Sequence, residues 1–278
     1  MFKNIALAPL LIICSCIITP ALAQTYTFGI VPQQSASKLA QIWTPILSLL
    51  SEKTGDTYLF STAKDIPTFE QRLKDGEYDF AYMNPYHFTI FNQAPGYQAL
   101  LKQKNKGIQG IIVVPLDSPL RSIEDLTTLT DIKIAFPAPA AFAASVILQA
   151  KLKQLNVDYQ PVYVSSHDSV YLNISQNTFT AGGGIIRTLK NTLTKSQEQL
   201  RILWKSPKYT PHAIAVHPSV PTKDSLVFQQ AVLDIQTTPE AIAALKLINI
   251  PELETAFNSD WDDVRALNIQ LLSHMLNL

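Results

Sequence analysis

Cysteine is almost absent from this sequence. The 278 residues contain two cysteines, Cys14 and Cys16. The chain beyond them has no thiol, which excludes disulfides, cysteine nucleophiles and cysteine metal ligands from that part. Net charge is absent as well, because 22 Lys and Arg balance 22 Asp and Glu. Without a long basic run, neither nucleic acid nor an anionic membrane surface is an expected partner.

Several motifs of catalysis and cofactor binding are missing too. The Gly-x-Ser-x-Gly nucleophile elbow does not occur. The glycine run Gly182–Gly184 is too short for a dinucleotide fingerprint and is expected to allow close approach of a ligand or a packed helix. The five histidines, His87, His167, His212, His217 and His274, lack metal-ligand spacing. No metal and no cofactor is therefore expected.

The N-terminus carries the pattern of a secretory signal peptide. Lys3 precedes an apolar run, Pro20 ends that run, and Ala21 and Ala23 are the small residues of a cleavage site. The run is too short for a transmembrane helix. We therefore expect export to the periplasm. Lipidation at Cys16 is the alternative, but the Ala-Leu-Ala site is the better match.

Beyond residue 24, strand patterns alternate with helix patterns, which predicts an α/β fold with parallel or mixed sheets. The pattern restarts after a proline-marked strand at 110–115, so two lobes joined by crossing strands near 113–118 and 205–216 are expected. The tail from Asp224 is predicted to be helical and to return to the first lobe. The expected division is signal peptide 1–23, first lobe 24–114 and 215–278, and second lobe 115–214.

Polar segments follow the predicted strands at 32–37, 83–87, 137–141, 165–169 and 182–184. Ligands of open α/β sheets bind beyond the carboxyl ends of strands, and four of these segments run into helix N-termini, which favour anions. The sequence therefore predicts an anion site between the lobes. Serines such as Ser35, Ser37 and Ser166 can also act as helix caps.

The stretch Ser166-His167-Asp168 contains the residue types of a hydrolase triad. Neighbours in sequence point in different directions, so they cannot form the nucleophile–base–acid relay. We expect Ser166 or Asp168 to cap a helix and His167 to face the cleft. Arg187, one helical turn after the glycine run, is expected to form a surface salt bridge, with anion contact as the alternative.

Five segments, FGIVPQQSASKLAQIWTPIL, DFAYMNPYHF, AFPAPAAFAAS, SHDSVYL and AGGGIIRTL, resemble in order and spacing the periplasmic phosphate-, phosphite- and phosphonate-binding proteins, the PhnD-like family. The resemblance implies a type II periplasmic binding fold, with a mixed sheet flanked by helices in each lobe and two crossing hinge strands. The ligand contacts that it implies are Gln34, Ser35, Ser37, Tyr82, Asn84, Tyr86, Ala140, Ala141 and His167. We add Ser166 to these candidates because it directly precedes His167.

The chain departs from that family in two places. Its oxyanion loop reads Ala138-Pro139-Ala140-Ala141, so backbone N–H groups would have to replace hydroxyl donors. The strand end at 181–184 has no acid to hold an aminoalkyl ammonium, so an aminoalkylphosphonate is not expected. A different small anion and a more apolar ligand both remain open.

The leading hypothesis is a non-enzymatic, monomeric periplasmic solute-binding protein of an ABC importer. It would bind a small phosphate-like oxyanion and deliver it to a permease in the inner membrane. The first alternative is a periplasmic sensor that reports its ligand to a membrane histidine kinase. The second alternative is a secreted hydrolase.

Overall fold

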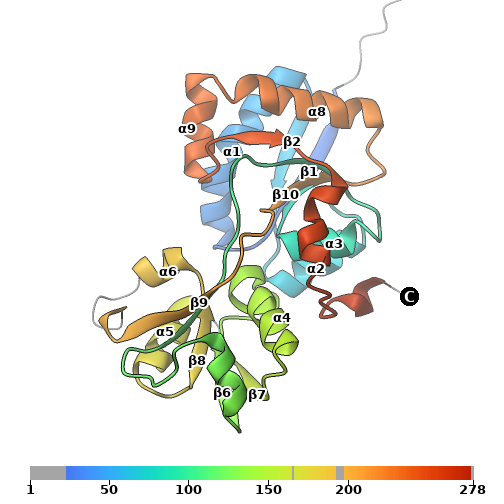
Figure 1. The fold of residues 1–278 in the computed structure, drawn as a ribbon. Helices are drawn as coiled ribbons and strands as arrows, with labels where there is room; N and C mark the ends of the chain where they lie inside the picture. The colour runs from blue at the N-terminus through green and yellow to red at the C-terminus, as the bar shows by residue number, and fades with distance from the viewer. Residues whose placement is uncertain (1–22, 165, 192–196, 277–278) are drawn as a thin grey trace, which may run out of the picture.

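The computed structural model describes residues 23–164, 166–191 and 197–276, which form two α/β lobes (Figure 1). The first lobe is built around a six-stranded sheet and the second around a five-stranded sheet. The predicted fold class, with two lobes and mixed sheets, is confirmed. Residues 1–22 of the predicted signal peptide lie outside the described residues.

The first sheet contains β1 (Thr25–Ile30), β2 (Thr57–Ser61), β3 (Phe80–Met83), β4 (Gln98–Gln103), β10 (Ala213–Val216) and β11 (Leu253–Thr255). Its order is β11–β4–β10–β3–β1–β2. Strands β1, β2 and β3 are parallel, whereas β10 runs antiparallel to β3. Because Ala213 pairs with Met83, β10 begins at the edge where the parallel strands end.

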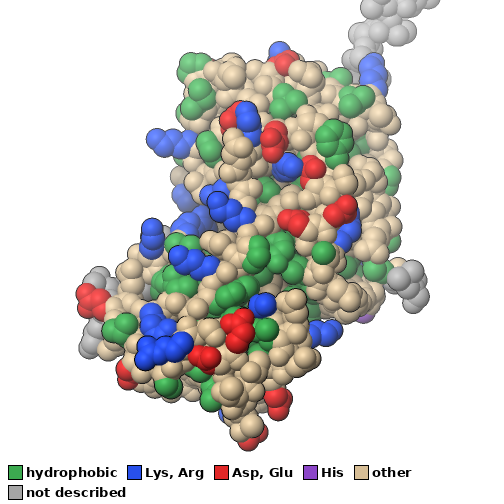
Figure 2. All heavy atoms as spheres, viewed as in Figure 1, with side chains coloured by type: hydrophobic (Ala, Val, Ile, Leu, Met, Phe, Trp, Pro, Cys, Tyr) green, Lys and Arg blue, Asp and Glu red, His purple; other side chains and the backbone are tan. Residues whose placement is uncertain are grey.

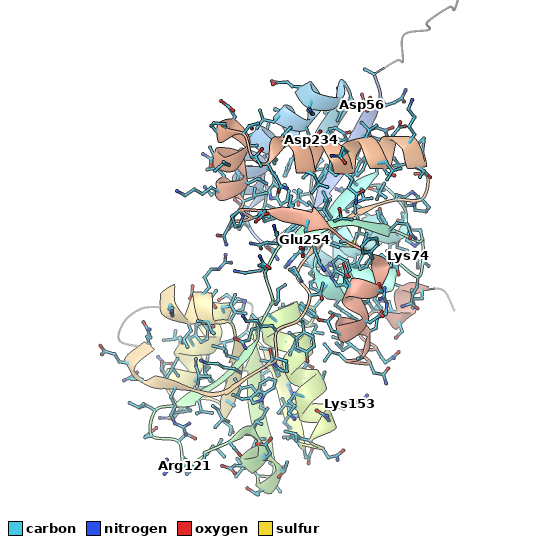
Figure 3. All side chains as sticks on the ribbon, turned by 45° about the horizontal axis from the view of Figure 1, so that its top comes forward. Asp56, Lys74, Arg121, Lys153, Asp234 and Glu254 are labelled. Atoms are coloured by element: carbon cyan, nitrogen blue, oxygen red, sulfur yellow. The ribbon has the colours of Figure 1, made fainter. Side chains whose placement is uncertain are left out.

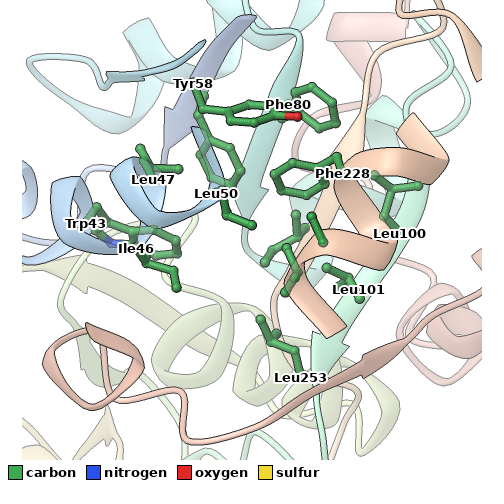
Figure 4. Packing of buried hydrophobic residues seen from close by; sticks show 14 of the residues in the cluster. Trp43, Ile46, Leu47, Leu50, Tyr58, Phe80, Leu100, Leu101, Phe228 and Leu253 are labelled. Atoms are coloured by element: carbon green, nitrogen blue, oxygen red, sulfur yellow. The ribbon is translucent and has the colours of Figure 1, made fainter. Parts of the chain in front are cut away.

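Helices cover both faces of the first sheet. One face is covered by α1 (Ala36–Thr54), α8 (Thr222–Ile235) and α9 (Pro239–Leu247), and the other by α2 (Ile66–Lys74), α3 (Pro85–Phe91) and α10 (Asp262–Arg265). Phe80 faces the first group, with its ring centroid 4.4 Å from Phe228 and 5.6 Å from Tyr58 (Figure 4). Such ring pairs add to the free energy gained from burial alone.

The second sheet contains β5 (Ile111–Pro115), β6 (Ile132–Phe136), β7 (Tyr159–Tyr163), β8 (Ala181–Gly184) and β9 (Leu200–Lys205), in the order β7–β6–β8–β5–β9. Strand β6 is parallel to β7 and β8, and β5 is antiparallel to β8 and β9. The helical elements are η1 (Ile123–Thr128), the π-helical turn η2 (Phe142–Val146), α4 (Ile147–Gln154), α5 (His167–Ser175) and α6 (Ile186–Asn191).

Two chain segments, 104–110 and 206–212, connect the lobes and run close together (Figure 1). Ile108 and Tyr209 form an antiparallel bridge, with two N–H···O bonds of 2.8 Å each. The predicted boundaries at 114/115 and 214/215 therefore need correction, since β5 belongs to the second sheet and all of β10 to the first. The proline at the end of the segment 110–115 suggested that this segment connects the lobes. Residues Ile111–Val114 are instead fully buried in the second sheet, between β8 and β9.

The C-terminal tail returns to the first lobe as predicted, but it is not helical throughout. Helices α8 and α9 cover its two clearest helical patterns. After Leu247 the chain forms β11, which pairs with β4, and then the 3-10 turn η3 (Asn258–Trp261), α10 and the 3-10 turn η4 (Ser273–Leu276). Strand β11 is stabilised by backbone hydrogen bonds to β4, and such pairing between distant segments cannot be read from a helical pattern.

Charged side chains of both signs are distributed over the outside of both lobes. Asp56 and Asp234 lie on the first lobe, and Arg121 and Lys153 on the second (Figure 3). The space-filling view is hollowed at the left, where the lobes meet, and Lys and Arg side chains gather along that margin (Figure 2). Within the described ranges, no helix has the length and apolar character needed to cross a membrane.

Candidate functional site

The turn after β1 carries exposed polar side chains at the N-terminus of α1. Ser35 caps α1, because its hydroxyl accepts a hydrogen bond from the Lys38 N–H at 3.3 Å, and it lies 3.3 Å from the Ser37 hydroxyl. Gln34, Ser35 and Ser37 are all exposed. The structure thus gives Ser35 the capping role and leaves all three side chains accessible to a ligand.

A row of rings lies beside this turn. Trp43 of α1 contacts Tyr82 at the end of β3, with a centroid distance of 4.8 Å. Tyr82 in turn stacks on His212 at 4.9 Å, with 14° between the ring planes. Trp43 is buried, whereas Tyr82 and His212 are half-buried. Burial raises the pKa of the Tyr82 hydroxyl, so it stays protonated and can donate a hydrogen bond.

His212 is neutral in this site. Burial, with smaller contributions from His87 and Arg187, lowers the pKa of His212 to about 3. The Gln33 amide nitrogen lies 2.8 Å from Nε2 of His212. An amide nitrogen only donates, so Nε2 accepts and the ring proton resides on Nδ1. His212 therefore presents a neutral N–H donor.

The sequence analysis did not select His212 and Gln33, which the structure places beside Tyr82. Gln33 lay in the collected segment 32–37 but was not chosen, and His212 was considered only for metal-ligand spacing, because the collected segments all follow strands. His212 precedes β10, and because β10 is antiparallel, its first residue lies at the edge where β3 ends. The available signal in the sequence was a histidine directly before an apolar strand. The sequence does not give the direction of that strand, which is needed to interpret the signal.

Asn84 and Tyr86 have other partners in the structure. Asn84 is buried and caps α3 by accepting the His87 N–H at 2.8 Å. Tyr86 is also buried, and its hydroxyl accepts the Leu272 N–H at 2.9 Å. Beneath them, His87 Nε2 lies 2.9 Å from the buried Glu70 carboxylate. The polar groups of these residues are thus bonded inside the first lobe.

The loop at residues 137–141 folds onto itself. The Ser145 hydroxyl donates to the Ala138 carbonyl at 2.6 Å, and the Ala141 N–H donates to the same oxygen at 3.3 Å. Ala140 and Ala141 are half-buried. The first N–H groups of η2, beginning at Phe142, have no intrahelical acceptor, so backbone donors are what this loop can offer an anion.

The turn after β7 confirms the predicted capping role of Ser166. Its hydroxyl accepts the Ser169 N–H at 3.0 Å and donates to the Ser169 hydroxyl at 2.9 Å, which starts α5. His167 is half-buried, and its Nδ1 has no hydrogen-bond partner among the described residues. Burial lowers the pKa of His167, opposed by Asp168 and assisted by Arg187. Since Ser166 is bonded to Ser169, the arrangement is a helix cap and not a triad.

The glycine run serves helix packing. A Cβ on Gly183 would lie 2.0 Å from the Ala144 carbonyl oxygen, and one on Gly184 would lie 2.3 Å from the Tyr171 hydroxyl. Neither distance is possible for a real side chain, so β8 approaches η2 and α5 as closely as backbone allows. The predicted use of this run for close helix packing is confirmed.

Arg187 does not form the surface salt bridge expected for it, since the ion pairs found among the described residues do not include it. Its charge acts on Tyr82, His167 and His212. Tyr82 and His212 belong to the first lobe and His167 to the second, so the charge of Arg187 reaches groups of both lobes. In residues 23–164, 166–191 and 197–276, no group of three or more His, Asp or Glu could hold a metal ion.

Two α/β lobes joined by two crossing segments are the architecture of two-lobed ligand-binding proteins. A family model described as the periplasmic substrate-binding protein of phosphonate ABC transporters matches residues 28–261. The chain belongs to this family, which is a transport family and not an enzyme family.

Similar proteins agree with this membership. The phosphate-import protein PhnD of Mycolicibacterium smegmatis is 20% identical over 206 residues, which is 66% of this chain and 63% of that protein. The match thus spans less than two thirds of that relative. A binding component of a phosphonate transporter from Pseudomonas aeruginosa shares the fold, with a TM-score of 0.71, 17% identity and coverage of 88% and 86%. The fold is also similar to that of a PhnD1 protein of Prochlorococcus marinus in complex with methylphosphonate, with a TM-score of 0.72 and 14% identity. This match covers 88% of this chain and 97% of that protein.

Proposed function

We propose that this protein is a periplasmic solute-binding protein of an ABC importer that binds a small phosphate-like oxyanion between its lobes. It would be exported by its signal peptide, bind its ligand as a monomer and deliver it to a permease in the inner membrane. The observation that carries the proposal is the set of neutral donors around the cleft, centred on His212 and Tyr82, in a chain of this family.

The proposed binding residues come from both lobes. The first lobe would contribute Gln34, Ser35, Ser37, Tyr82 and His212. The second lobe would contribute His167 and the backbone at Ala140 and Ala141, where a helix begins. Asn84, Tyr86 and Ser166 are left out because their polar groups are bonded within their own lobes. A ligand held by both walls would stabilise the closed arrangement of the lobes.

A thermal-shift screen of the processed protein against phosphate, phosphite, methylphosphonate, methanesulfonate and arsenite tests this function. A ligand that binds the native state raises the melting temperature by mass action. We expect at least one phosphorus oxyanion to do so at millimolar concentration. If none does, the proposed function is wrong.

His167→Ala separates ligand contact from stability. The His167 ring is half-buried and its Nδ1 has no partner, so its loss should change the unliganded melting temperature little. We expect the ligand-induced shift to fall. An equal loss in the unliganded protein would mean that His167 is structural.

A further inference from the structure

The beginning of β1 is held by the turn between α1 and β2. The backbone N–H of Gln24 donates to Oδ1 of the Asp56 carboxylate at 2.9 Å, and the Gln24 carbonyl accepts the Thr57 N–H at 2.8 Å. Thr25 then pairs with Thr57 at the start of the parallel β1–β2 ladder. The backbone nitrogen of Gln24 is therefore fixed beside one particular carboxylate.

Asp56 is itself held by the turn that ends α1. Gly55 caps the helix with a φ of +81° and donates its N–H to the Ser51 carbonyl at 2.9 Å. The Asp56 N–H donates to the Thr54 hydroxyl at 3.2 Å. These bonds use backbone groups and not the carboxylate of Asp56, so the carboxylate remains available to the Gln24 nitrogen.

The Asp56 carboxylate has no cationic partner among the described residues. Asp56 is half-buried, and the ion pairs found in that part of the chain do not include it. Lys53, the closest lysine along the chain, is 3.6 Å from Asp234 instead. A carboxylate that faces a neutral N–H would gain a stronger contact if that nitrogen became charged.

Export would change the charge of this nitrogen. Cleavage after Ala23, at the site predicted from Ala21 and Ala23, would convert the Gln24 amide nitrogen into a primary α-amine. Such an amine is mostly an ammonium at neutral pH. A hydrogen bond from an ammonium to a carboxylate is roughly twice as strong as one between neutral groups. Processing would therefore strengthen the contact between Gln24 and Asp56.

Glutamine is also the residue that can cyclise when it stands at an N-terminus. The free α-amine attacks Cδ of its own side-chain amide, and a new C–N bond forms as the Cδ–Nε2 bond breaks. The attacking nitrogen gives up one proton, the leaving nitrogen departs as ammonia, and pyroglutamate remains. The attack requires a lone pair, which an ammonium lacks, so pairing of the ammonium with a carboxylate slows the reaction.

We propose that Asp56 is the receptor for the processed N-terminus: it pairs with the Gln24 ammonium and protects Gln24 from cyclising to pyroglutamate. The inference goes beyond ligand binding and rests on the proposed function only for export and cleavage after Ala23. It assigns Gln24 as a modification site whose reactivity the fold controls through one carboxylate.

The test follows the N-terminus of the exported protein. The full chain is expressed with its signal peptide, and the protein recovered from the periplasm is incubated at neutral pH and analysed by intact mass spectrometry and Edman degradation. We expect the wild-type protein to begin at Gln24 with a free amine, which Edman degradation reads and pyroglutamate would block. Asp56→Asn should lose ammonia at least fivefold faster, because the amide keeps the size of the side chain but not its charge.

Two controls isolate the contact. Glu52→Gln removes an exposed acid from the last turn of α1, four residues before Asp56, and should change the rate of ammonia loss less than twofold. In concentrated urea the contact is absent, so the wild-type protein and Asp56→Asn should cyclise at the same rate. The melting temperature of each variant shows whether it is folded during the incubation.

Each outcome either supports or overturns the inference. An exported chain that begins at another residue, or that already begins with pyroglutamate, overturns it. Equal rates for the folded wild-type protein and Asp56→Asn overturn it, and so does a difference that persists in urea. Oxyanion binding is measured separately by the thermal-shift screen, so a failure of this inference leaves the proposed ligand class untouched, and the reverse also holds.

Discussion

The two lobes share an architecture but are packed in different ways. Among the largest fully buried side chains of the described residues, Phe136 and Tyr171 come from the second lobe and all others from the first. The second lobe instead brings backbone against backbone, as at Gly183. The interior of the first lobe is therefore packed through large aromatic side chains, whereas the second lobe is packed through close approach of backbone segments.

The largest expected effect tests the backbone packing of the second lobe. In Gly183→Ala, the new Cβ would meet the Ala144 carbonyl oxygen at 2.0 Å and side-chain atoms of Leu148 and Phe136 below 3 Å. We expect the free energy of unfolding, measured by urea denaturation, to fall by about 3 kcal/mol. Gly55→Ala in the first lobe is the control, because its φ is +81° but no atom lies within 4 Å of the Cβ. It should cost about 1–2 kcal/mol, and an equal loss for both would argue against close packing at Gly183.

A second substitution tests the buried polar pair of the first lobe. Glu70 and His87 are 2.9 Å apart and almost fully buried, with side-chain exposures of 6% and 0%. Glu70→Gln should lower the free energy of unfolding by about 2 kcal/mol, because a charge-assisted hydrogen bond is lost inside the protein. Glu77→Gln removes an exposed partner of Arg72 and should cost less than about 0.5 kcal/mol. Similar losses would mean that burial does not strengthen the Glu70–His87 contact.

The third prediction compares the histidines of the two walls by pH. The unfolded chain protonates a histidine near its ordinary value of about 6.5, whereas folded His212 protonates at about 3. Below pH 6.5 the unfolded state therefore binds more protons, so stability is lost as pH falls, by up to about 1.4 kcal/mol per pH unit. His212→Asn should reduce the loss of unfolding free energy between pH 7 and pH 5. His167→Asn should reduce it less, since the pKa of His167 is lowered by a smaller amount. A slope unchanged by His212→Asn would contradict a neutral, buried imidazole.

The smallest effect concerns the helix cap at the second-lobe wall. Ser166→Ala removes the acceptor of the Ser169 N–H and should cost about 1 kcal/mol of unfolding free energy. Ser166→Asn should recover most of that loss, and the affinity for the oxyanion should stay within threefold in both variants. Loss of ligand binding in both variants at unchanged stability would assign Ser166 to the ligand and not to the helix.

Much of the fold could be predicted from periodic patterns. The apolar residues of α1 and the Ser35 cap indicated its course, although the helix continues through Pro45. The polar residues after the parallel strands lie at the carboxyl ends of those strands, as the pattern indicated. Strand β11 was missed because its three residues are too few to show the alternation of apolar and polar residues that marks a strand. Only its pairing with β4 identifies it as a strand.

The site was harder to predict, for physical reasons. Asn84 and Tyr86 lie at the expected strand end, but a chain turning into α3 directs their polar groups inward. His212 lies at the end of β3 because β10, which follows it, runs antiparallel to β3. The turn before Arg187 is held by the Tyr171 hydroxyl, a contact between two segments that no local pattern encodes.

The bridge between Ile108 and Tyr209 has a mechanical consequence. Two independent tethers would let the lobes slide, tilt and twist against each other. Tied at their midpoint by two backbone hydrogen bonds, they behave as a single narrow ribbon. Bending about one axis is then the easiest deformation, so a single inter-lobe distance would report how far the molecule is open. The described residues contain no cysteine, so one cysteine introduced on each lobe would provide two specific labelling sites for measuring that distance.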